Sequence, residues 1–208
     1  MLRAYLILTT GILLLALVTL RAQAQVSTGI SIGKEGVQGF YFAIGEYYHL
    51  PEKEVIVVHE RRVPDEELPV VFFIAREAHV ALSVIIDLRL SGKSWWEITV
   101  HYGLSPEIFY VPVEVVPGPP YGKAYGYYKK KPRKEWKSIV LSDVDVVNFV
   151  NLRFMTEHYG YRPEEVIRMR SAGKSFVVIH DEVIKGKAGK GEKHGAGKGK
   201  GKGKGRKK

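Results

Sequence analysis

The chain has 208 residues, 45% of them hydrophobic and 11% aromatic, which is enough to fill the core of one ordinary domain. It contains no cysteine, which excludes a disulfide framework, a thiolate metal site and a cysteine nucleophile. The net charge of +10 arises in residues 185–208, which hold eleven Lys or Arg and one acid, whereas residues 1–184 hold 21 of each sign. The basic character therefore belongs to the tail and not to the folded part.

Residues 1–24 are predicted to be a cleavable secretory signal peptide. Arg3 gives a positive start, residues 4–20 form an uncharged run, and Ala22 and Ala24 are small residues at the positions that signal peptidase reads. The expected cut between Ala24 and Gln25 makes the mature protein periplasmic or secreted. The alternative is an uncleaved membrane anchor, although a run of about 17 residues is shorter than the roughly 20 that a membrane span needs.

Residues 25–45 are predicted to form an extended lead-in or a small hairpin. The prediction rests on short apolar alternation in Val26–Ile32 and Phe40–Ile44. The glycines of this segment do not follow the G-x-G-x-x-G spacing of a dinucleotide site, so their role is interpreted as structural.

Residues 46–111 and 138–184 are predicted to form two or three helix-turn-helix-like hairpin repeats that share one core. The pattern of Val84–Trp95 recurs 81 residues later in Glu165–Phe176, with an arginine, a Gly-Lys-Ser and an aromatic residue in register. His101–Glu107 has an echo in His158–Glu164, and a fainter third copy begins at Glu46. The sequence therefore predicts a mainly α fold.

Helix start and stop signals support these repeats. Pro-Glu pairs at positions 51, 106 and 163 are typical of a first helical turn. Gly92 and Gly173 stand where a helix is expected to end, and Ser94 and Glu97 fit a capping box for the next helix. Ser142 is expected to open a further helix in the same way. These signals explain both Gly-Lys-Ser sequences without a nucleotide-binding loop, which needs a further glycine upstream.

Residues 112–137 are predicted to form an exposed loop that divides the repeats. Prolines and a glycine fill positions 117–120, and tyrosines and lysines follow. Aromatic faces stack on bases or sugars while lysines neutralise phosphates or carboxylates, so this segment is the best binding candidate in the folded region. The alternative is that its tyrosines pack back on the core.

Residues 185–208 alternate glycine and lysine and are predicted to be a disordered tail, because they cannot bury enough apolar surface to offset the entropy of ordering. Eleven cations on a flexible chain attract any polyanion, with an affinity that falls as salt rises. The alternative is that the tail only solubilises the protein.

The expected partner is an anionic polymer or surface: lipopolysaccharide, an acidic polysaccharide, extracellular nucleic acid or anionic lipid headgroups. No small-molecule substrate is identified. The residues expected to contact the polyanion are Tyr121, Lys123, Tyr125, Tyr127, Tyr128, Lys129, Lys130, Lys131, Arg133 and Lys134 in the loop, and Lys198, Lys200, Lys202, Lys204, Arg206, Lys207 and Lys208 in the tail.

The segment Val84–Val111 resembles a helix-turn-helix unit of bacterial DNA-binding proteins. The residues that carry the resemblance are Ile86, Arg89, Gly92, Ser94, Trp95, Glu97, Ile98, Gly103, Leu104, Ser105 and Phe109. The resemblance implies that Pro106–Tyr110 would enter the major groove, but this stretch has no Arg, Asn, Gln or Lys to read base edges. Compact helix packing is the preferred interpretation. The whole chain is also similar to exported bacterial proteins of unknown function, a resemblance that implies no activity.

No catalytic residue, metal site or cofactor is expected. The seven histidines include no H-E-x-x-H spacing, and no G-x-S-x-G elbow occurs. The function predicted is that of an exported, non-enzymatic binding or scaffold protein that contacts a polyanion. One alternative is a membrane-anchored helix-turn-helix DNA-binding protein. A second is an exported enzyme that uses His101, His158 or His180.

Overall fold

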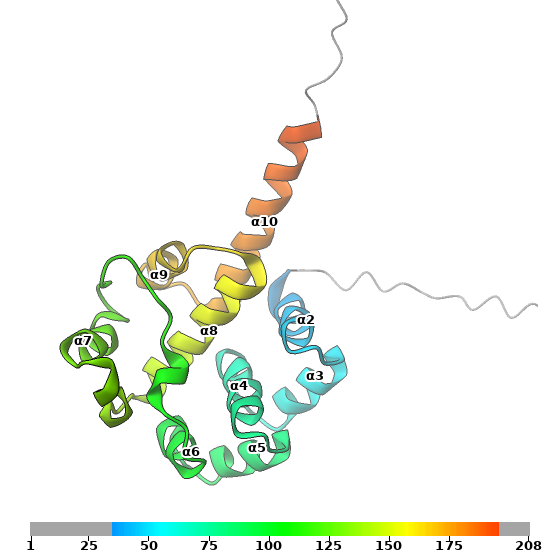
Figure 1. Cartoon of the computed structure of the whole chain (residues 1–208). Helices are drawn as coiled ribbons and strands as arrows, with labels where there is room; N and C mark the ends of the chain where they lie inside the picture. Colours follow the sequence, from blue (N-terminus) through cyan, green and yellow to red (C-terminus); the bar gives the residue numbers. More distant parts are fainter. Residues whose placement is uncertain (1–34, 196–208) are drawn as a thin grey trace, which may run out of the picture. The chain divides into compact units, whose positions relative to one another are not determined.

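The computed structural model describes the backbone of residues 35–195 and the side chains of residues 35–186 (Figure 1). The chain divides into two units, Met1–Ser31 and Ile32–Lys208, and every described residue belongs to the second. The described residues form helices joined by turns and by one longer irregular segment, residues 110–121, without a strand among them, so the mainly α prediction is confirmed. The predicted signal peptide, its cut at Ala24 and the alternation in Val26–Ile32 lie outside the described residues.

Two helices, α4 (Leu68–Ala78) and α8 (Asp143–Tyr159), supply much of the core. In chain order the elements are α2 (Gly36–Tyr48), α3 (Glu52–Glu60), η1 (Asp65–Glu67), α4 (Leu68–Ala78), α5 (Leu82–Leu90), α6 (Trp95–His101), η2 (Pro106–Phe109), α7 (Gly122–Lys130), η3 (Arg133–Ser138), α8 (Asp143–Tyr159), α9 (Pro163–Ser171) and α10 (Phe176–Gly195), where η marks a 3₁₀ helix. Every residue of α4 from Leu68 to Ala75 is buried, and α4 packs against α8. The core is therefore built around the α4–α8 contact.

The predicted extended lead-in is wrong from residue 36 onward, because these residues form α2. Phe40, Tyr41 and Ile44 are buried and lie at helical spacing on one side of this helix. The ring of Phe40 meets that of Phe154 in α8, edge to face, with centroids 5.9 Å apart. A five-residue alternation was too short to distinguish strand from helix.

The predicted exposed loop at residues 112–137 is also wrong in its second half. The chain is irregular through Pro117–Pro120, but α7 and η3 follow at once. Tyr121, Ala124, Tyr125 and Tyr128 recur at the i, i+3, i+4, i+7 spacing of an amphipathic helix, and all four are buried. The proline density that argued against a helix applies only to residues before Tyr121.

The predicted start of the disordered tail at Lys185 is wrong as well, because the backbone of residues 185–195 continues α10. The first half of α10 is fixed by packing, with Phe176, Ile179 and Val183 buried. Extending an existing helix adds one hydrogen bond for each residue fixed, so the backbone continues α10 although four of residues 185–195 are glycines, which are poor helix formers. The tail residues from 196 to 208 lie outside the described residues.

The local stop and start signals are confirmed. Ser94 and Glu97 form a reciprocal capping box at the start of α6, and Ser142 and Asp145 form another at the start of α8. Pro51 precedes α3 directly and Pro163 begins α9. Gly92 and Gly173 have φ angles of 91° and 84°, the left-handed conformation that glycine adopts without steric cost.

Three helix pairs each contain two residues with positive φ, at the same spacing. His49, His79 and Gly160 have positive φ and follow α2, α4 and α8. The next positive-φ residues are Arg62, Gly92 and Gly173, each 13 residues further along, just after α3, α5 and α9. The pairs α2–α3, α4–α5 and α8–α9 thus have matching turn positions, and the second helix of each pair is 9 residues long.

Candidate polyanion-binding surface

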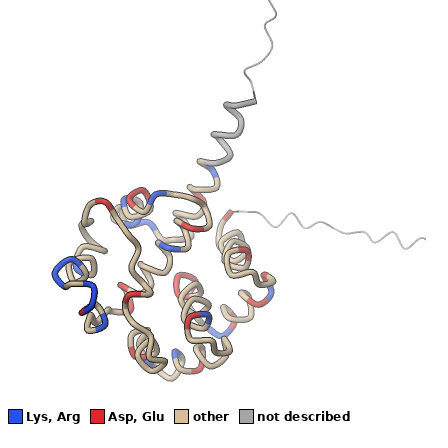
Figure 2. Tube along the Cα trace, in the orientation of Figure 1, with Lys and Arg blue, Asp and Glu red and all other residues tan. Residues whose placement is uncertain are grey.

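Seven cations are concentrated on α7, η3 and the turn between them. We call them the cationic cluster: Lys123, Lys129, Lys130, Lys131, Arg133, Lys134 and Lys137. Residues 121–137 contain one acid, Glu135, whereas the other residues of 35–186 hold 12 Lys or Arg against 20 Asp or Glu. Figure 2 shows the resulting run of blue along this part of the trace. The folded region therefore carries a basic segment on an otherwise acidic surface.

Buried tyrosines hold α7 in place beneath these cations. Tyr125 donates a hydrogen bond to the Val111 carbonyl, and Tyr128 donates one to the Pro106 carbonyl, each at 2.7 Å. Both rings meet Phe149 of α8 edge to face. Burial raises the pKa of both phenols well above the usual value of 10, so both remain protonated donors. The helix is thereby fixed to η2 and α8.

Trp136 closes the carboxyl end of α7. Its Nε1 donates to the carbonyls of Tyr128 and Lys131, both at 3.1 Å. The Arg133 guanidinium lies 5.5 Å from the centre of the Trp136 ring and pairs with Glu107 at 2.6 Å. Lys129 and Lys130 stand in the last turn of α7, where the negative end of the helix dipole favours cations. The cluster is thus displayed on a packed support.

Of the six cations predicted in residues 121–134, the structure places five in solvent. Lys123, Lys129, Lys130, Arg133 and Lys134 are exposed, and Lys131 is half-buried with its Nζ donating to Ser138. Within residues 35–186, Arg133 alone of the cluster takes part in an ion pair. Lys137 is exposed and belongs to the same surface, although it was missing from the predicted residues.

The predicted stacking role of three tyrosines is wrong. Tyr121, Tyr125 and Tyr128 are 1%, 2% and 2% exposed, so their faces cannot reach a ligand. Tyr127 is half-buried. The alternative, in which the tyrosines pack back on the core, is the correct one, because their helical spacing turns them toward Phe149. The predicted tail contacts from Lys198 to Lys208 lie outside the described residues.

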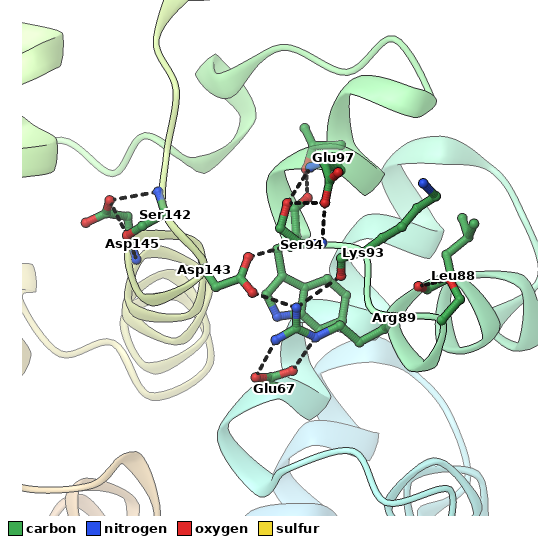
Figure 3. A network of polar contacts seen from close by, with 12 residues as sticks. Glu67, Leu88, Arg89, Lys93, Ser94, Glu97, Ser142, Asp143 and Asp145 are labelled. Atoms are coloured by element: carbon green, nitrogen blue, oxygen red, sulfur yellow. Dashed lines mark hydrogen bonds and ion pairs between the residues drawn. The ribbon is translucent and has the colours of Figure 1, made fainter.

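The two Gly-Lys-Ser turns are held by arginines rather than arranged to bind phosphate. Arg89 binds both oxygens of Glu67 at 2.8 and 2.9 Å, Asp143 at 2.6 Å and the Lys93 carbonyl at 3.1 Å (Figure 3). Its guanidinium lies 4.6 Å from the centre of the Trp95 ring. Asp143 in turn accepts the Trp95 amide at 2.7 Å. This network joins η1, α5, α6 and α8.

Arg170 makes the corresponding contacts 81 residues later. It binds both oxygens of Glu66 at 3.0 and 3.2 Å and the Lys174 carbonyl at 2.9 Å, and it lies 4.7 Å from the centre of the Phe176 ring. Glu66 accepts the Phe176 amide at 2.7 Å. A cleft of about 600 Å³ lies beside both networks, with Asp65, Glu66, Glu67 and Asp143 on its wall. Each of these carboxylates already has a protein partner, so the cleft acids stabilise the fold.

The helix-turn-helix resemblance gains no support from the geometry. The element that would enter the major groove is η2, a four-residue 3₁₀ turn in which Pro106 and Phe109 are buried. It presents no recognition helix of the kind that places several side chains on base edges. The arrangement of α5, α6 and η2 is therefore better explained as compact packing.

The three histidines considered for an enzyme, His101, His158 and His180, each contact an aromatic ring. His101 is exposed at the end of α6 with its ring against Tyr102. His180 is 1% exposed, and its Nδ1 lies 2.6 Å from the Tyr159 hydroxyl. No group of three or more His, Cys, Asp or Glu side chains suited to a metal ion occurs in the described part of the chain. Among residues 35–195, none of the helices has the length and apolar character needed to cross a membrane.

Comparison of the chain with protein-family models, with curated proteins and with solved structures gives no match.

Proposed function

We propose that this chain is an exported, non-enzymatic binding or scaffold protein that contacts a polyanion through its cationic cluster and its Gly/Lys tail. The observation that carries the proposal is the separation of charge: seven cations and one acid in residues 121–137, against an excess of eight acids over the rest of residues 35–186. Fixed, unpaired lysines on one segment are suited to binding phosphates, sulfates or carboxylates of a polymer.

The burial of the tyrosines limits the mode of binding. With Tyr121, Tyr125 and Tyr128 in the core, the cluster offers charge rather than aromatic platforms. A protein that binds by charge alone is expected to show little preference for nucleic-acid sequence and a strong dependence on salt. The tail adds a second set of cations on the same chain, so the two sets together can bind one long polymer more tightly than either alone.

The test is polyanion binding by a cluster variant. The triple variant K129S/K130S/K134S removes three exposed cations and should bind polyphosphate more weakly, with a shallower dependence on salt. The slope of log K against log salt should fall by about 2 to 3, because each lost contact removes slightly less than one unit. The control K53S/K93S/R168S removes three exposed cations from other parts of the surface and should leave the slope nearly unchanged. Equal effects of the two variants would contradict a localised binding surface.

The export part of the proposal rests on the order of charge, apolar run and small residues in positions 1–24. The intact mass of the protein from fractionated cells tests it. A soluble extracytoplasmic protein that begins at Gln25 is expected. A full-length mass in the membrane fraction would contradict export and favour the membrane-anchored DNA-binding alternative.

We also propose that α2–α3, α4–α5 and α8–α9 are copies of one structural unit. The support is the 13-residue spacing of their positive-φ turns, together with the matching contacts of Arg89 and Arg170. In a protein of repeated helical pairs, each unit buries its apolar side against its neighbours, which is the arrangement expected of a scaffold.

A further inference from the structure

An exposed apolar turn lies directly before α7. We call residues 115–120 the apolar turn; its sequence is Val-Val-Pro-Gly-Pro-Pro, without a polar side chain. Val115 is 73% exposed, more than any other large hydrophobic side chain in the described residues, and Val116 is 39% exposed. Pro119 is exposed as well. Neighbouring apolar side chains that a fold leaves in solvent form a candidate contact surface.

The apolar turn offers fewer free backbone polar groups than an ordinary loop of its length. Three of its six residues are prolines, which have no amide N–H to satisfy. The Gly118 carbonyl accepts the amides of Tyr121 and Gly122 at 3.2 and 2.9 Å. The Pro119 carbonyl accepts the Ser171 hydroxyl at 2.7 Å. Because an unsatisfied backbone group is costly in an apolar medium, this turn can leave water more readily than most loops.

The same hydrogen bonds fix the apolar turn to the start of α7 and hence to the cationic cluster. Gly122 is the first residue of α7, and Lys123 of the cluster follows it. The helix has 9 residues and is therefore about 13 Å long, with Lys129 and Lys130 in its last turn. Residues 115–134 contain six cations and no acid. One short helix thus holds exposed valines and exposed lysines close together.

We propose that the apolar turn and the cationic cluster together bind the surface of an anionic lipid bilayer, with Val115 and Val116 inserted among the headgroups; this rests on the proposed function and specifies its partner. Lysines are attracted to a bilayer of negative lipids, and apolar side chains that enter its interface strengthen the binding. Tyr127 and Trp136 of the same segment are half-buried, and both ring types are enriched at membrane–water interfaces. A dissolved polyanion such as polyphosphate has no apolar layer beneath its charges, so it offers nothing to the valines.

Flotation with lipid vesicles tests the contribution of the valines. The protein as purified from cells is mixed with vesicles of phosphatidylcholine and phosphatidylglycerol, or of phosphatidylcholine alone, which should bind it at least about tenfold more weakly. V115S/V116S should weaken binding to the mixed vesicles about tenfold or more, because both valines lose their transfer out of water. The control V57S/V100S removes two valines that are 56% and 52% exposed on α3 and α6, and it should bind like the wild type. Polyphosphate binding should be the same for all three proteins.

A label on the apolar turn reports insertion directly. Because the chain contains no cysteine, V116C carries a single environment-sensitive dye. Its emission should shift to the blue on the mixed vesicles and stay unchanged with polyphosphate. The same dye in V57C should not shift with either. A V116C label that remains in water while the protein is bound to vesicles would show that the turn does not insert, and would refute this inference.

The thermal unfolding midpoint of V115S/V116S should match that of the wild type, because both side chains are exposed in the fold. Equal affinities of V115S/V116S and the wild type for the mixed vesicles would overturn the inference, and so would equal binding to vesicles with and without phosphatidylglycerol. A protein that binds polyphosphate but not the mixed vesicles would overturn it while the proposed function stands. The proposed function fails separately, if K129S/K130S/K134S binds polyphosphate and the mixed vesicles as tightly as the wild type.

Discussion

Replacing Arg89 by methionine tests whether the network beside the Gly-Lys-Ser turn holds the helices together. The side chain of Arg89 is 20% exposed, and its partners Glu67 and Asp143 are 17% and 33% exposed. The guanidinium makes three hydrogen bonds to carboxylates and one to a carbonyl, and it lies over Trp95. Methionine keeps most of the contact with Trp95 but leaves two carboxylates facing each other without a cation.

The loss in free energy of unfolding caused by R89M depends on how far Arg89, Glu67 and Asp143 are exposed to solvent. A hydrogen bond to a charged group contributes about 1.5–3 kcal/mol. Breaking a fully buried ion pair costs about 3–5 kcal/mol, whereas exposed pairs contribute about 0–1 kcal/mol. Because the Arg89 network is partly accessible to solvent, and because Asp143 keeps the Trp95 amide, we expect R89M to lower the free energy of unfolding by about 2–4 kcal/mol.

Urea unfolding followed by circular dichroism measures this change. The matched control is R61M, which breaks the Arg61–Asp87 pair at 2.8 Å, whose side chains are 45% and 65% exposed. It should cost no more than about 1 kcal/mol. R170M should resemble R89M, because Arg170 makes the corresponding contacts to Glu66 and Phe176. An R89M protein as stable as R61M would refute the reasoning that this network joins the helices.

Two further predictions concern α7 and α6. Tyr128→Phe removes the hydrogen bond to the buried Pro106 carbonyl and should cost about 1–3 kcal/mol in chemical unfolding, with no loss expected for the half-buried Tyr127→Phe. The Ser94 amide and hydroxyl lower the pKa of Glu97, so its carboxylate stabilises the fold above its ordinary pKa of 4.5 and that contribution is lost as pH falls through the lowered value. The stability difference between wild type and E97Q should therefore be constant near neutral pH and should shrink in acid, and a constant difference throughout would contradict the capping role.

The sequence by itself determined the features that depend on neighbouring residues. The capping boxes at Ser94 and Ser142 involve residues three positions apart, and the turns at Gly92 and Gly173 need a left-handed residue. Hydrogen bonds of this range form wherever the local sequence permits them. The mainly α fold and the positions of these helix ends could therefore be predicted from the sequence.

Only part of the candidate binding surface could be predicted from the sequence. The cations of residues 121–137 were found because charge is visible in the sequence. The role of the tyrosines was misread because the proline-rich start of the segment hid the helical spacing of Tyr121, Tyr125 and Tyr128. Lys137 lies within the segment predicted to bind but was not named among its contact residues.

Only the tertiary structure decided which side chains reach solvent and which distant groups meet. The burial of Tyr128 depends on Pro106 and Phe149, which come from other elements. The pairing of Arg170 with Glu66 joins residues 104 positions apart, and the bond from Ser171 to the Pro119 carbonyl joins residues 52 positions apart. Such contacts form because the packing of α4 against α8 and of α7 against α8 brings these segments together, and local propensity carries no information about that packing.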